Sequence, residues 1–192
     1  MTLDEIVDNY IREYSDDARN EMRAFEGESS PAAAIRKAAL SQCWNGKRHP
    51  HQRRIPIMVL RQAEERLQAI GPSLAKAADF AVLHRLVEEE IGRIKGIGEL
   101  AVYDIAHRVG AHFGKEPRLV YLHAGTRTGA RGLNLKGDSV DPASLPDAFS
   151  RLSAAEIEDC LCIYKDELNG LRRRSHRCCS VSAVERRRRR CL

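Results

Sequence analysis

The chain has 192 residues, of which 43% are hydrophobic and 31% charged, the composition of a globular protein that can bury a sizeable core. No apolar run approaches the roughly 20 residues that a membrane helix needs, and the acidic start (MTLDE) lacks a signal-peptide core. We therefore expect a cytoplasmic protein without a membrane partner. The net charge is +5, but residues 172–192 hold nine of the 32 Lys and Arg and one of the 27 Asp and Glu. Because the remaining chain is slightly acidic, the overall charge does not argue for a nucleic-acid partner.

Helical periodicity is the first signal along the chain. An apolar stripe predicts a helix over 2–25, where Thr2 and Glu5 have the spacing of a capping box. Ser30-Pro31 then reads as the cap and first residue of an alanine-rich helix that ends near Gln42. Both patterns predict where a helix begins from side chains that lie within its first turn.

A basic segment, WNGKRHPHQRR at 44–54, interrupts the helices and predicts a loop. Its cations (Lys47, Arg48, Arg53 and Arg54) stand beside Trp44, an arrangement that can grip a phosphate backbone and stack on a base. The alternative is a solvated loop whose Trp44 enters the core.

Three further helices follow in the middle of the chain. The first begins at Pro56 and ends at Gly71-Pro72, the second covers 73–91, and the third covers 99–113, with Gly114 closing it.

The helical periodicity of the preceding segments is lost between residues 117 and 146. Residues 119–122 (LVYL) are a strand or a buried helical turn, and 138–146 reads as a loop. Ser153 and Glu156 predict a capping box at the start of a last helix, which Asn169-Gly170 should end. We therefore predict an all-α domain over 1–171 that contains one helix-hairpin-helix, followed by a disordered arginine-rich tail over 172–192. The tail either adds salt-sensitive affinity for nucleic acid or is an unconstrained terminus.

Residues 94–99 (IKGIGE) join two amphipathic helices by alternating apolar residues and glycines. Together with Val102, in a position where a small residue is usual, this pattern resembles a helix-hairpin-helix motif over about 83–110. The resemblance implies sequence-independent DNA binding through phosphate contacts. We assign the contacts to Lys95, Gly96, Ile97, Gly98 and Glu99.

The chemistry of these residues supports the same assignment. Glycines permit positive φ and close approach of another backbone, and the amides at the start of the next helix favour an anion. Lys95 would offset the repulsion between Glu99 and a phosphate. The alternative is a tight helix junction that binds nothing or contacts another protein.

A second glycine cluster covers 125–132. Its amides and the side chains of Thr126, Arg127, Thr128 and Arg131 make it a second candidate anion site, of the nest type. A plain flexible loop is the competing interpretation.

No catalytic residue can be assigned. The hairpin also resembles that of DNA glycosylases, but Leu100 occupies the position of their catalytic lysine, and residues 117–124 contain no acid where they have an aspartate. His123 lies there without a visible partner for general-base chemistry. The six cysteines and seven histidines lack metal-ligand spacing, so we expect no metal and no cofactor.

The sequence therefore favours a DNA-binding protein, with RNA as an alternative partner and the oligomeric state open. The other hypotheses are a helical protein-interaction module and, third, a glycosylase-like DNA-processing enzyme.

Overall fold

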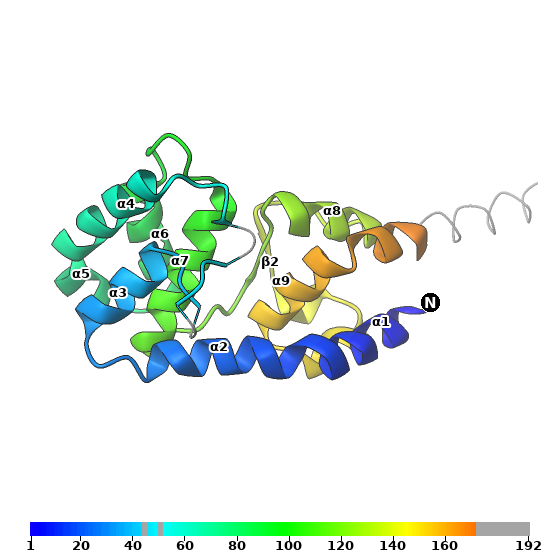
Figure 1. The fold of residues 1–192 in the computed structure, drawn as a ribbon. Helices are drawn as coiled ribbons and strands as arrows, with labels where there is room; N and C mark the ends of the chain where they lie inside the picture. The colour runs from blue at the N-terminus through cyan, green and yellow to red at the C-terminus, as the bar shows by residue number, and fades with distance from the viewer. Residues whose placement is uncertain (44–45, 50–51, 172–192) are drawn as a thin grey trace, which may run out of the picture. The chain divides into compact units, whose positions relative to one another are not determined.

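A computed structural model of the chain describes residues 1–43, 46–49 and 52–171 (Figure 1). These residues are mainly helical, which confirms the all-α class. The predicted tail and Trp44 lie outside the described residues. Among the helices that are described, none combines the length and apolarity that crossing a membrane requires.

The chain groups into two compact units, a division that no pattern in the sequence indicates. The first unit is discontinuous and contains Met1–Glu13 and residues 119–171; the second is Tyr14–Arg118. The N-terminal helical stretch crosses the boundary between them, as α1 (Leu3–Tyr10), a π-helical turn η1 (Ile11–Ser15) and α2 (Asp16–Glu26). The capping box of Thr2 with Glu5 is confirmed at its start.

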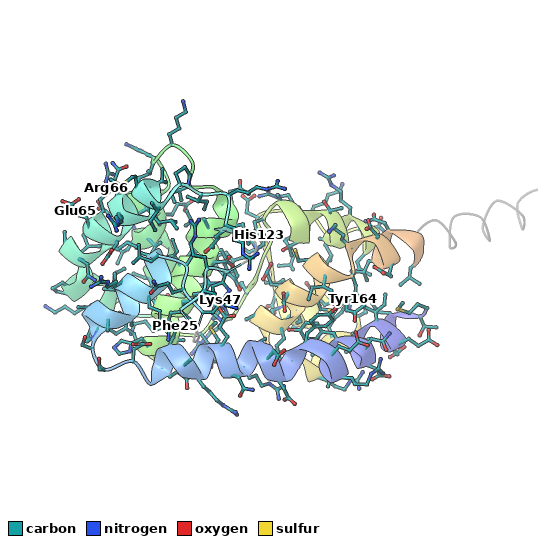
Figure 2. The ribbon with its side chains drawn as sticks, viewed as in Figure 1. Phe25, Lys47, Glu65, Arg66, His123 and Tyr164 are labelled. Atoms are coloured by element: carbon teal, nitrogen blue, oxygen red, sulfur yellow. The ribbon has the colours of Figure 1, made fainter. Side chains whose placement is uncertain are left out.

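The second unit is built around α7. This helix contacts α2, α3 and α6, and most of its residues are buried. Its apolar core includes Phe25 near the end of α2 (Figure 2), together with Leu60 and Leu83. The helices after α2 are α3 (Pro31–Ala39), α4 (Ile57–Ala69), α5 (Gly71–Lys76), α6 (Phe80–Ile91) and α7 (Glu99–His112).

The predicted helix over 73–91 is wrong in its extent. Gly71 begins α5 instead of ending α4, with Pro72 in the first turn, where proline is tolerated. A new helix, α6, then starts after Asp79, whose side chain accepts a hydrogen bond from the Val82 amide at 2.9 Å. The apolar spacing continues across this break, which is why periodicity alone did not reveal it.

The first unit combines helices with a two-stranded antiparallel sheet. Val120 pairs with Val140, so the LVYL segment is a strand and the segment predicted as a loop contains its partner. The predicted helix stop at Asn169-Gly170 is wrong, because residues 165–171 are helical. The elements after α1 are β1 (Val120–Tyr121), α8 (Ala124–Gly132), β2 (Ser139–Val140), two 3-10 turns η3 (Pro142–Ser144) and η4 (Asp147–Arg151), and α9 (Ala154–Ile163).

The core of the first unit lies between α1 and α9. Ile6 and Tyr10 of α1 are fully buried, as is Cys160 of α9. Tyr10 donates a hydrogen bond to Asp159 at 3.1 Å. The pKa of the phenol is raised well above its ordinary value, mainly by burial and secondly by the nearby Asp159 carboxylate. Burial likewise raises the pKa of the Cys160 thiol to about 12. The predicted capping box of Ser153 is confirmed at the start of α9.

Helix α8 packs against α9 (Figure 1), and three of its glycines face α9 or the helical residues that follow it. Gly125, Gly129 and Gly132 recur at steps of four and three, so they share one helical face. A Cβ at Gly129 would overlap the carbonyl oxygen of Leu161 and lie 2.9 Å from its carbonyl carbon. The expected loop is therefore wrong: the glycines here serve close helix packing.

Candidate nucleic-acid interface

The connection between α6 and α7 is a tight turn that depends on glycine. The amide of Ile94 donates to the carbonyl of Ile91 at 3.0 Å, and the amide of Ile97 donates to that of Ile94 at 2.9 Å. Between the two isoleucines, Gly96 has φ +103°, a conformation that L side chains rarely adopt. Gly98 then takes an extended conformation as the N-cap of α7.

Buried and exposed residues alternate along this hairpin, following the alternation of isoleucines with glycines and Lys95 in its sequence. Ile94 and Ile97 are only 7% and 8% exposed, so they anchor the hairpin in the core of the unit. Lys95, Gly96 and Gly98 are exposed. A Cβ placed on Gly98 would meet no heavy atom within 4 Å, so the backbone at this point is open to an approaching molecule.

The first turn of α7 gives the hairpin its electrostatic character. Gly98 accepts the first helical hydrogen bond, from Val102 at 3.1 Å, but has no side chain with which to cap the amides that follow. Such amides and the helix dipole attract an anion. Lys95 adds a positive charge and Glu99, exposed in the same turn, a negative one. Val102, whose amide donates to the Gly98 carbonyl, is buried.

The basic segment before α4 is held in place by its own arginine. Arg48 donates to the carbonyl oxygens of Ile55 at 2.7 Å and Arg53 at 3.0 Å. The side chains of Arg53 and Arg54 are exposed. Lys47 is exposed as well, so the part of the segment that the structure describes presents three cations and uses a fourth, Arg48, to fix the chain.

A buried polar network, absent from the sequence predictions, ties the same segment to α7. Arg108 donates to Glu21 at 2.9 Å and to Gln52 at 3.2 Å, and Gln52 donates to Asp104 at 2.7 Å. Arg108 is 6% exposed and Gln52 is 2% exposed. Near this network, burial and then Glu21 raise the pKa of the Cys43 thiol, against the opposing effect of Arg108.

The residues of the second candidate anion site lie in the other unit, on α8. The hydroxyl of Thr126 donates to Glu158, and that of Thr128 donates to the Ala124 carbonyl at 3.1 Å. Arg127 approaches Asp138 at 3.4 Å, while Arg131 is exposed. Because the segment is helical, the nest conformation that motivated this site is not formed. Anion binding by the two arginines stays a prediction.

His123, which precedes α8 (Figure 2), has a partner that the sequence analysis missed. Its Nε2 lies 2.6 Å from the Glu158 Oε1, the same oxygen to which Thr126 donates. The side chains of His123, Glu158 and Thr126 are all buried, so the cluster braces α8 against α9. Glu158 lies on the apolar stripe of α9, next to Ile157. A carboxylate on a buried helix face needs a polar partner, so this position could have indicated the cluster from the sequence.

Comparison with known proteins finds no matching family model, no matching curated protein and no matching solved structure.

Proposed function

We propose that the protein binds duplex DNA without sequence preference, through the hairpin of residues 94–99. The observation that supports this is the arrangement of the two glycines. Gly96 and Gly98 are exposed at the open N-terminus of α7, while Ile94 and Ile97 hold the turn rigidly from below. A phosphate oxygen can approach the amides at this point without meeting a side chain.

The contacts available at the hairpin explain the lack of sequence preference. Backbone amides and a lysine recognise phosphate oxygens, which are the same at every base pair. Lys95 and the exposed Arg93 supply positive charge, and Glu99 partly opposes them. We therefore expect affinity in the range of ordinary non-specific complexes, with Kd of about 10⁻⁶ to 10⁻⁴ M at physiological salt.

The test is the binding of the full chain to a duplex of roughly 20 base pairs, measured by fluorescence anisotropy across a range of salt concentrations. Gly98→Val adds a side chain in open space, so it should leave the fold intact and block the phosphate. We expect it to weaken binding by about tenfold, which corresponds to the loss of one charge-assisted contact. Lys95→Ala should reduce the slope of log K against log salt by about 1.

Lys76→Ala is the matched control. Lys76 is exposed at the end of α5, and its removal changes the net charge by the same amount as Lys95→Ala. All variants keep the arginine-rich tail, so differences between them report on the hairpin alone. Equal affinity of wild type and folded Gly98→Val would refute the proposal, and absence of any salt-dependent binding would favour the protein-interaction alternative.

A further inference from the structure

Two large apolar side chains are exposed side by side at the start of α4. Ile57 is 44% exposed and Met58 is 67% exposed, whereas Leu60, in the same turn, is fully buried. Single exposed apolar residues are common on protein surfaces, whereas contiguous apolar patches mark interaction sites. We call Ile57 and Met58 the apolar pair.

The apolar pair is rigidly held. Pro56, the N-cap of α4, has a restricted φ, and Arg48 holds the residues just before it by donating to the carbonyl oxygens of Arg53 and Ile55. The side chains therefore project from a fixed backbone, and the conformational entropy lost on binding is limited to their own rotamers.

The apolar pair lies beside the hairpin. A Cβ on Gly96 would be 3.6 Å from a methyl group of Val59, the residue that follows Met58, so the hairpin tip rests on the first turn of α4. A molecule bound at Gly96 and Gly98 thus lies within one helical turn of the apolar pair.

The charges around the apolar pair favour a polyanion. Arg53 and Arg54 are exposed immediately before α4, and Arg61 is exposed one turn later on the face that carries Ile57 and Met58. The acids further along this face are Glu64, which is half-buried and pairs with Arg36 at 3.6 Å, and Glu65, which is exposed (Figure 2). A cationic rim around an apolar projection fits nucleic acid better than the apolar face of a protein, which would leave the three arginines without counter-charges.

We propose that Ile57 and Met58 form a wedge that enters a base step of the duplex held by the hairpin, so that a duplex with interrupted stacking is the preferred ligand. Apolar side chains of this kind unstack and kink DNA when they insert between base pairs. Unstacking costs free energy in an intact duplex and much less at a nick, where the strand is no longer continuous. The inference rests on the proposed DNA-binding function.

The experiment compares two duplexes of identical sequence, one intact and one with a single central nick, as ligands of the full chain. Wild type should bind the nicked duplex about tenfold more tightly. The double substitution Ile57→Ala and Met58→Ala should abolish this preference and leave affinity for the intact duplex within about twofold, because the phosphate contacts remain. Both positions are exposed, so the variant should fold.

Two further variants separate the outcomes. Gly98→Val should weaken binding to both duplexes equally, and Ile163→Ala, which removes another exposed apolar side chain (36% exposed), should change neither. Failure of wild type to bind either duplex refutes DNA binding itself. Equal binding of both duplexes by wild type, or a preference that survives the double substitution, overturns the wedge while DNA binding stands. The wedge is also overturned if sedimentation shows that the apolar pair holds two copies of the chain together.

Discussion

Gly129 is the position at which one added methyl group should do the most damage. In Gly129→Ala the Cβ would overlap the Leu161 carbonyl oxygen and lie 2.9 Å from the carbonyl carbon and 3.2 Å from the Cα. These are backbone atoms of α9, which cannot rotate away, so α8 and α9 must separate by about 1 Å to restore ordinary contact distances. Overpacking of this kind costs about 3 kcal/mol at the upper end of its usual range. Alanine's helix preference over glycine offsets about 1 kcal/mol, so we expect a net loss of about 2 kcal/mol.

Urea unfolding followed by circular dichroism measures this loss as a lower midpoint at unchanged slope. Two other glycines of the same unit are controls. Gly125→Ala meets the flexible Cys162 side chain, so its cost should be smaller, and Gly170→Ala meets nothing within 4 Å, so it should be neutral or slightly stabilising. A Gly129→Ala midpoint equal to that of Gly170→Ala would refute the backbone-packing explanation of the glycine stripe.

Three further predictions concern stability in urea titrations. Burial raises the pKa of Cys160 from 9.0 to about 12, so the folded state holds a proton that the unfolded chain releases as pH rises. Between neutral pH and pH 10.5 the wild type should therefore lose about 2 kcal/mol more stability than Cys160→Ala, in which the buried phenol of Tyr10 still contributes its own loss. Arg108→Met removes the buried guanidinium that pairs with Glu21, leaving His49 Nε2 3.1 Å from this carboxylate, and should cost about 2–3 kcal/mol, whereas Arg85→Met, at an exposed ion pair, should cost less than about 0.5 kcal/mol. Ser153→Ala removes the capping box of α9 and should cost about 1 kcal/mol; a change of less than about 0.3 kcal/mol would contradict its role.

The helix starts could be predicted where their chemistry is local. Thr2, Ser30 and Ser153 each cap an amide three residues ahead, so the sequence contains both partners of the hydrogen bond within one turn. The hairpin is local in the same sense, because the burial of Ile94 and Ile97 and the positive φ of Gly96 follow from six consecutive residues. Its contact with phosphate stays a prediction.

The remaining features depend on contacts between distant residues. Intrinsic preference assigns a glycine-rich segment to a loop, yet α8 is helical because its glycine face packs against α9, and tertiary packing outweighs propensity. The spacing of Gly125, Gly129 and Gly132 at steps of four and three is typical of one helix face and could have predicted this helix. Glu158 and Arg108 interrupt apolar stripes, but their partners lie 32 and 87 residues away, and no local pattern identifies them.

The discontinuous first unit has a consequence for biosynthesis. Its α1 leaves the ribosome before the strands and helices that cover Ile6, Val7 and Tyr10, because these are encoded beyond residue 118. At bacterial to eukaryotic translation speeds of about 5–20 residues per second, α1 waits roughly 5–20 s for them. The unit formed by Tyr14–Arg118 has all its residues synthesised in that interval and can fold during translation. A nascent chain in which residues up to 118 have left the ribosome and later residues have not would therefore carry a complete helical unit and an amphipathic α1 with an uncovered apolar face, the kind of surface that chaperones recognise.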